Sequence, residues 1–229
     1  METLSLKDGA ESFDVTQVKV AYPSRVVLFA VGGGGDPRRH LPLLMALAER
    51  GCSVVAPHFE RLSSPRVTPD ELLLRTRRLR LALDAVRPSE LLVAGVGHSI
   101  GATALLALAG GQVWMRPGER LDSQADDRLA RLVLLCPATG FFRAPGALDA
   151  VRTPTLAWAG TADAITPPEQ VELLERELGG RVAVEVRVAA GAGHFSFMHT
   201  PPPHTTEPLE NREAFLAELA SEVCRFVTR

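Results

Sequence analysis

The pentapeptide GHSIG at positions 97–101 is the segment whose residue types and spacing most directly indicate chemistry. An apolar run of strand length, Leu91–Val96, precedes it, and the helix-forming run ATALLALAG follows it. This is the G-x-S-x-G pattern of a sharp turn between a strand and a helix. Glycines are needed there because side chains would collide with neighbouring backbone, while the serine hydroxyl stands exposed above the sheet. The motif predicts that Ser99 is a nucleophile.

A serine hydroxyl needs a general base, and that base needs a carboxylate to orient it. Asp163 follows the expected strand Thr155–Ala159, and His194 follows the expected strand Val182–Val188 in a loop rich in glycine. Both positions are expected where parallel strands end, which is where ligand-facing residues gather. Taken singly, an aspartate that caps its own turn and a core histidine are the alternatives. Together with the serine motif, the order serine, acid, histidine predicts a triad of Ser99, Asp163 and His194.

Acyl transfer also needs two N–H donors for the negative charge that develops on the substrate oxygen. The backbone N–H of Ile100 directly follows the nucleophile and is the first donor expected. The second is expected in the glycine run at 32–35, after the early strand Val26–Val31. Phosphate binding is the alternative for this run. However, no Lys-Ser/Thr follows it, and a G-x-G-x-x-G pattern lacks its last glycine.

Five large apolar residues fall in loops next to the expected site and could line an apolar pocket for the acyl or alcohol group. They are Phe141, Phe142, Phe195, Phe197 and Met198. Ordinary cover of the core is an equally good interpretation. His194, His199 and His204 recur every five residues, a spacing that puts them on no common helix or strand face, so no metal site is predicted. His98 is expected to pack or hydrogen-bond locally.

The elements that must position these residues are apolar runs of strand length that alternate with helical segments. This pattern predicts a mostly parallel sheet with helices on both faces. The looser alternation of Phe13–Val20 indicates an antiparallel edge strand. The expected parallel strands are Val26–Val31, Ser53–Ala56, Leu91–Val96, Leu132–Cys136, Thr155–Ala159 and Val182–Val188.

Helix signals fit between these strands. Leu41–Arg50 is one expected helix, and Asn211–Val227 is a long closing helix. Capping boxes at 68–71 and 166–169 predict two more helices, the first running to about Val86 and the second ending at Gly179. In the first of these, four arginines are expected on a solvated face: Arg75, Arg77, Arg78 and Arg80. The polar segment Gly111–Arg128 is too short for a lid domain, although it could form a small flap over the site.

The composition is that of an ordinary globular protein: 46% of the 229 residues are hydrophobic and 23% are charged. One domain covering residues 1–229 is expected at this length. With 25 basic and 27 acidic groups and no block of one sign, the chain predicts no nucleic-acid or membrane partner. Three scattered cysteines and the lack of a targeting or membrane-spanning pattern indicate a cytoplasmic protein. The oligomeric state stays open.

Most of the chain resembles the α/β-hydrolase superfamily. The segments GHSIGATALLALAGG, AGTADAITPPEQ and GAGHFSFM resemble serine-type predicted dienelactone hydrolases and, more distantly, platelet-activating-factor acetylhydrolases. The resemblance implies an α/β-hydrolase fold with a minimal lid or none, the same triad, and an oxyanion hole formed by the amides of Gly33 and Ile100. Many members have His-Gly where this chain has Val31-Gly32, which leaves Gly34 as the alternative to Gly33.

These observations predict a serine esterase that acts on small or medium carboxylic esters through an acyl-enzyme and needs no cofactor. Dienelactone hydrolases in the strict sense have cysteine at the position that corresponds to Ser99, so their substrate is not assigned to this chain. Thioester or short-peptide hydrolysis would use the same groups and remains open. A non-catalytic scaffold for ligand or protein binding is the alternative from another class, and the intact triad argues against it.

Overall fold

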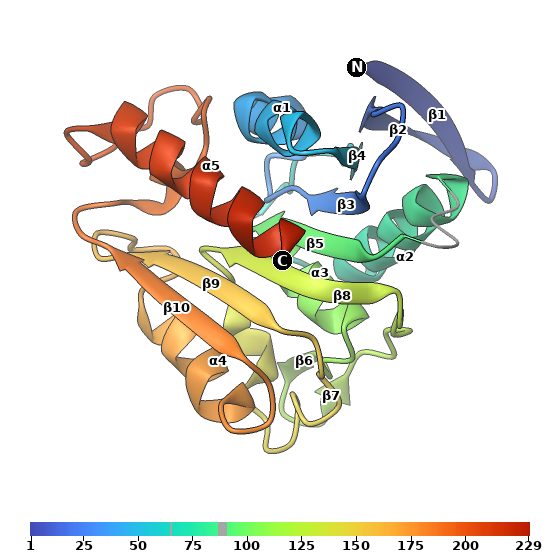
Figure 1. The fold of residues 1–229 in the computed structure, drawn as a ribbon. Helices are drawn as coiled ribbons and strands as arrows, with labels where there is room; N and C mark the ends of the chain where they lie inside the picture. Colours follow the sequence, from blue (N-terminus) through green and yellow to red (C-terminus); the bar gives the residue numbers. More distant parts are fainter. Residues whose placement is uncertain (65, 87–90) are drawn as a thin grey trace.

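The computed structural model describes residues 1–64, 66–86 and 91–229, in which helices cover both faces of a central sheet (Figure 1). Eight strands form this sheet: β1 (Glu2–Asp8), β2 (Glu11–Val18), β3 (Arg25–Ala30), β4 (Cys52–Pro57), β5 (Val93–His98), β8 (Leu129–Leu135), β9 (Thr155–Gly160) and β10 (Val184–Ala189). The order is β1-β2-β4-β3-β5-β8-β9-β10. From β4 to β10 all neighbours are parallel, as the alternating pattern predicts.

The antiparallel part of the sheet differs from the expectation. Phe13–Val20 was expected at the edge, but its strand β2 lies between β4 and an additional strand, β1. All of β1 is half-buried or exposed, with the burial alternating between the two, so its sequence lacks the apolar run that marks the central strands. A strand that is partly exposed to solvent lacks a continuous apolar run and is therefore hard to recognise in the sequence.

Helices pack on the two faces because side chains alternate along each strand. Val27 and Phe29 of β3 face α1 (Leu41–Glu49) and α5 (Arg212–Thr228). Val26 and Leu28 face the opposite layer, which holds α2 (Pro69–Val86), α3 (Ile100–Leu108) and α4 (Glu169–Leu178). None of the helices in the described residues has the length and apolarity needed to cross a membrane.

Helix α2 begins as expected, but its arginines do not form one solvated face. Thr68 and Glu71 make the reciprocal bonds of a capping box, with N···O distances of 2.7 and 3.2 Å. Arg75 and Arg78, however, are only 2% and 7% exposed. Arg78 pairs with carboxylates of the β1–β2 hairpin, and Arg75 reaches backbone carbonyls. The solvated-face interpretation is therefore wrong for these two residues.

The segment Gly111–Arg128 holds a small hairpin of β6 (Trp114–Arg116) and β7 (Glu119–Arg120). In Figure 1 this hairpin lies below α3, beside α4. It is anchored by backbone bonds from Gln112 to Ala147 and from Asp126 to Leu108. These contacts hold the segment against the body of the protein.

Candidate active site

Ser99 occupies a strained turn between β5 and α3. Its φ of 55° and ψ of −126° are values that non-glycine residues rarely adopt. The turn is fixed by the Ser99 N–H, which donates to the Leu135 carbonyl at 2.9 Å, and by the Ser99 carbonyl, which accepts from Ala102 at 3.0 Å. Backbone strain of this kind persists only where surrounding contacts enforce it, and it is concentrated at functional sites.

The two glycines of the motif leave room for this turn. A Cβ on Gly97 would stand 2.9 Å from the backbone of Ala102, and one on Gly101 would stand 2.2 Å from the carbonyl oxygen of Ala30. Neither backbone atom can move aside without displacing β3 or α3. The structure thus supplies the steric reason for G-x-S-x-G in this chain.

Three side chains that are far apart in the sequence form a continuous hydrogen-bonded chain. The Ser99 hydroxyl donates to Nε2 of His194 at 3.0 Å, and Nδ1 of His194 donates to Oδ2 of Asp163 at 2.8 Å. Ser99 follows β5, Asp163 follows β9, and His194 follows β10, so all three stand beyond the carboxyl ends of parallel strands. This is the geometry that a nucleophile, a base and an orienting acid require.

Asp163 is held as an ionised carboxylate by four donors. The N–H groups of Ile165 and Thr166 both donate to Oδ1 at 2.8 Å, while Oδ2 accepts from the Thr166 hydroxyl and from His194, also at 2.8 Å. Burial by itself would raise the pKa of the Asp163 carboxyl, but these hydrogen bonds outweigh it and lower the pKa to about 2. Asp163 therefore caps its own turn and orients His194 at the same time.

Thr166 is a site residue that the sequence interpretation missed. The T-x-x-E signal at 166–169 was taken as a capping box, but α4 begins at Glu169 and has no side-chain cap. Instead the Thr166 hydroxyl donates to Asp163, and its oxygen lies 3.0 Å from Nδ1 of His194. The capping prediction was wrong because Pro168, and not Thr166, stands at the N-cap of α4, and the Thr166 hydroxyl is directed at Asp163 and His194.

His98, beside the nucleophile, supports the histidine loop. It is 1% exposed, and its Nε2 donates to the backbone carbonyl of His194 at 3.0 Å. Burial lowers the pKa of His98 well below its usual value, so the ring is neutral and Nδ1 keeps a lone pair. Within the described residues that Nδ1 has no hydrogen-bond partner. A Cβ on Gly32 would stand 3.0 Å from it, so the ring packs directly under the glycine run.

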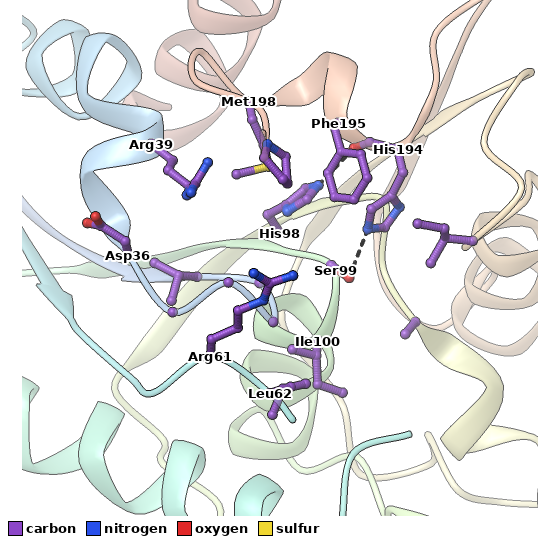
Figure 2. A pocket seen from close by; sticks show the side chains of 18 of the residues that line it. Asp36, Arg39, Arg61, Leu62, His98, Ser99, Ile100, His194, Phe195 and Met198 are labelled. Carbon is purple, nitrogen blue, oxygen red and sulfur yellow. Dashed lines mark hydrogen bonds between the residues drawn. The ribbon is translucent and has the colours of Figure 1, made fainter. Parts of the chain in front are cut away.

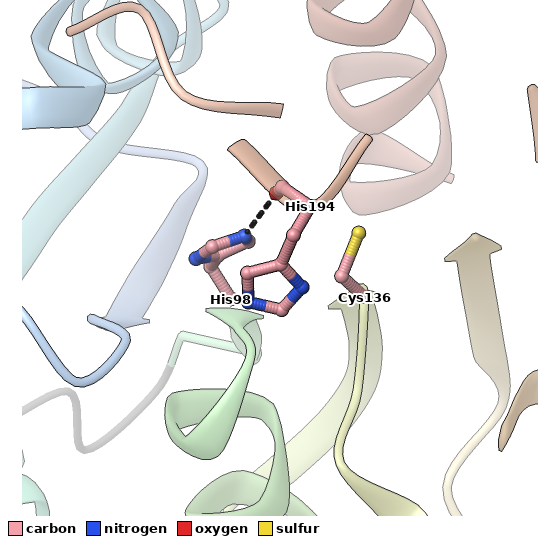
Figure 3. Close-up of side chains that lie close together, drawn as sticks. All are labelled: His98, Cys136 and His194. Carbon is pink, nitrogen blue, oxygen red and sulfur yellow. Dashed lines mark hydrogen bonds between the residues drawn. The ribbon is translucent and has the colours of Figure 1, made fainter. Parts of the chain in front are cut away.

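His98, Cys136 and His194 are the described residues that come close enough to suggest metal ligands (Figure 3). One ligand atom from each lies within 4.8 Å of the others, whereas His199 and His204 are not in the group. Both nitrogens of His194 and Nε2 of His98 already have hydrogen-bond partners. Burial also raises the pKa of the Cys136 thiol well above its usual value, which disfavours the thiolate that a metal needs. The arrangement fits support of the triad better than metal binding.

The glycine run forms a tight turn opposite His194. Gly35 N–H donates to the Gly32 carbonyl at 3.1 Å, and Leu62 N–H donates to the Gly33 carbonyl at 2.8 Å. A Cβ on Gly35 would stand 2.0 Å from the Phe59 carbonyl oxygen, so the turn lies directly against the segment after β4. Among the described residues, the backbone N–H of Gly33 has no acceptor, which leaves it available to a ligand.

A cavity of about 590 Å³ opens in front of Ser99 and is large enough for a small organic ligand. Figure 2 shows Ser99 and His194 on one side, with Arg39 and Arg61 extending from the other. The segment after β4 contributes Leu62 and further residues to this wall, a role that its sequence did not indicate. No residue of 111–128, all of which are described, lines the cavity, so this segment forms no flap there.

The five large apolar residues expected near the site divide into two groups. Phe141, Phe195 and Met198 line the cavity. Phe142 and Phe197 are at most 1% exposed and lie in the two hydrophobic cores. Phe197 instead packs against the rings of Trp158 and Phe215, with centroids 6.4 and 5.0 Å away.

Solved structures with the same arrangement of elements include hydrolases and esterases. A dienelactone hydrolase from Anabaena variabilis is 20% identical, with a TM-score of 0.69 over 98% of this chain and 95% of its own. An α/β serine hydrolase homologue from Coxiella burnetii is 19% identical, with a TM-score of 0.65 over 98% and 96%. An esterase from Thermogutta terrifontis, solved with propionate, is 19% identical, with a TM-score of 0.66 over 98% and 92%.

No family model matches the sequence, and no curated protein is similar to it in sequence. At identities of 19–20%, the structural likeness concerns the fold. It confirms the predicted α/β-hydrolase fold, with its mostly parallel sheet and helices on both faces.

Proposed function

We propose that this protein is a serine hydrolase that cleaves carboxylic esters of small or medium size through an acyl-enzyme. The observation that carries the proposal is the chain of hydrogen bonds from Ser99 through His194 to Asp163, at 3.0 and 2.8 Å, at the wall of an open cavity. Dienelactone hydrolase and esterase among the structural neighbours support the same class of chemistry.

In the first half of the reaction, Ser99 Oγ attacks the ester carbonyl while its proton passes to Nε2 of His194. The carbonyl oxygen becomes an oxyanion, and Asp163 stabilises the imidazolium. The tetrahedral intermediate then collapses, the alcohol leaves with the proton from Nε2, and the acyl group remains on Ser99. In the second half, water gives a proton to Nε2 and attacks the acyl carbonyl. The acid is released and Ser99 regains its proton.

The backbone amides of Gly33 and Ile100 are the donors we assign to the oxyanion. Ile100 is the first residue of α3, where the helix dipole adds partial positive charge. We prefer Gly33 to Gly34 because it directly follows Gly32, where an added Cβ would stand 3.4 Å from Cβ of Ser99. Gly34 is exposed at the tip of the turn. The substrate we expect is a small ester whose apolar part contacts Phe141, Phe195 and Met198.

Labelling with a fluorophosphonate probe, read by mass spectrometry, tests this proposal. A structural neighbour, the Thermogutta terrifontis esterase, has been solved phosphorylated by paraoxon, so organophosphorus reagents suit the fold. We expect a covalent adduct on Ser99 that is lost in His194→Ala. A folded wild-type protein that stays unlabelled and inactive would instead favour a binding scaffold. Parallel assays of an ester, the matching thioester and a short peptide amide then identify the leaving group.

A further inference from the structure

Arg75 of α2 is a buried cation that contacts the glycine run. It is 2% exposed, and its Nη1 donates to the carbonyl oxygens of Val31 at 3.1 Å and Gly32 at 3.4 Å. Its guanidinium carbon lies 4.6 Å from the centre of the Phe59 ring. Burial lowers the pKa of Arg75 to about 10, so the group is charged near neutrality.

The burial of this charge is unusual because, within the described residues, no carboxylate lies within ion-pair distance of it, and the charge of Glu71, one turn earlier on α2, only partly offsets the effect of burial on its pKa. Arg78, three residues further along α2, is also buried but bonds to Asp8 at 3.1 Å and to Glu11 at 2.6 Å. A buried charge without a counter-ion destabilises a fold relative to an apolar residue of similar size. We therefore expect that the bonds from Arg75 to the two carbonyls have a function other than stabilising the fold.

Peptide geometry supplies that role. In a planar trans peptide, the C=O of one residue and the N–H of the next point in opposite directions. Arg75 holds the Gly32 carbonyl towards α2, so the N–H of Gly33 points away from α2. Consecutive glycines have wide conformational freedom, and a rotated peptide would present a carbonyl to the substrate in place of a donor. The Gly35 N–H also donates to the Gly32 carbonyl, at 3.1 Å, but it belongs to the same glycine run, so Arg75 is the contact that ties this peptide to another element. The bond from Leu62 to the Gly33 carbonyl fixes the following peptide.

We propose that Arg75 is a positioning residue that fixes the Gly32–Gly33 peptide so that its N–H serves the oxyanion. This inference rests on the proposed serine hydrolase function. Arg75 acts through the glycine run and not by contact with substrate, because it does not line the cavity. Helix α2 is thereby part of the active-site architecture, although none of its residues belongs to the triad.

The test compares Arg75→Met with Arg78→Met, a matched control that removes a buried arginine from the same helix. For Arg75→Met we expect kcat on p-nitrophenyl butyrate to fall by about 10²-fold, the effect of losing one oxyanion donor, with KM changed less than about threefold. Arg75→Lys, which keeps one donor, should recover part of the loss. Arg78→Met should lower the unfolding temperature while kcat stays near that of the wild type.

A second readout follows the tetrahedral state itself. Phenylboronic acid adds to the serine oxygen and places a hydroxyl in the oxyanion hole, so its inhibition constant should rise in Arg75→Met in parallel with the loss of kcat/KM. A fall in kcat no larger than in Arg78→Met, or a change confined to KM, would overturn the positioning role. If Arg75→Met does not fold, Arg75→Lys against Arg78→Lys decides by the same criteria. Failure of wild-type Ser99 to be labelled overturns the proposed function, and this inference with it.

Discussion

The two sides of the candidate site are held in place by different kinds of contact. On the side of His194, buried polar side chains bond to one another in a closed network in which each donor has an acceptor. On the side of the glycine run, the group that we assign to the oxyanion is a backbone N–H, and in the described part of the chain its peptide is held by other backbone groups and by the side chain of Arg75.

This difference affects how each side responds to substitution. A network of side chains fails when any member is removed, because the others lose their protonation state or orientation. A backbone donor is deleted only by substitution with proline, which also changes the local backbone. Other substitutions can change only its position, which depends on the groups that hold its peptide. The first side should therefore show large effects at few positions, and the second should show smaller effects at residues that never contact substrate.

The largest effects are expected at the nucleophile and the base. Ser99→Ala and His194→Ala should each lower turnover of an activated ester by roughly 10⁴–10⁶-fold, because losing either stops the covalent step. The double variant should be little worse than either single variant. Steady-state rates corrected for background hydrolysis measure all three, and multiplicative losses in the double variant would show that the two residues act independently.

Asp163→Asn should lower turnover by about 10⁴-fold near neutrality, because an amide can hold the wrong tautomer of His194. The matched control is Asp149→Asn, which removes an acid that comes before the same strand. Asp149 precedes the amino end of β9, and its carboxylate pairs with Arg181 at the surface at 2.9 Å. Kinetics of both variants on one ester should find Asp149→Asn fully active, and the reverse result would remove Asp163 from the mechanism.

The same two sides differ in how far the sequence predicts them. The triad is visible in the sequence because Ser99, Asp163 and His194 are chemically distinctive and follow strands whose apolar runs are clear. Five of the six parallel strands were found for the same reason, since burial on both faces favours Val and Leu throughout. The sixth, β10, has no buried residue and was found from its alternating valines. Strand β1, with no buried residue, gave no such signal.

The support of the site depends on tertiary contacts that local patterns do not contain. Thr166 carries a local signal for a helix cap, but its hydroxyl lies against Asp163, three residues earlier, and His194, which is distant in sequence. Arg75 carries a local signal for a solvated face, but it bonds to distant backbone carbonyls. The Thr166 hydroxyl donates to Asp163 and does not cap α4. Arg75 is buried because it donates to the carbonyls of Val31 and Gly32, which follow β3. Residues that act on backbone atoms of another element cannot be identified from their own neighbours in sequence.

A smaller effect is expected for Thr166, which reaches the triad through one hydroxyl. Thr166→Val keeps the shape of the side chain and removes its bond to Asp163, so kcat/KM should fall by about tenfold, the equivalent of one net hydrogen bond. Thr166→Ser keeps the hydroxyl and should stay within about twofold of the wild type under the same assay. Equal losses in both variants would indicate that the methyl group, and not the hydroxyl, matters.

The smallest effect concerns stability and pH. The pKa of Asp163 is lowered to about 2 in the folded protein, below its ordinary value of 3.8. A carboxyl whose pKa is lowered on folding stabilises the fold above its unfolded pKa, and that contribution is lost as the pH falls towards the folded pKa. The free energy of unfolding of the wild type should therefore exceed that of Asp163→Asn above about pH 5, and the gap should narrow between about pH 4 and pH 2.

Urea unfolding of the wild type and of Asp163→Asn at a series of pH values measures this gap. If the difference in free energy of unfolding between the wild type and Asp163→Asn does not change with pH, the four donors stabilise the neutral amide as well as they stabilise the carboxylate. In that case the charge of Asp163 would add nothing to the free energy of unfolding. The two sides of the site would then both be held without any contribution from a charged carboxylate.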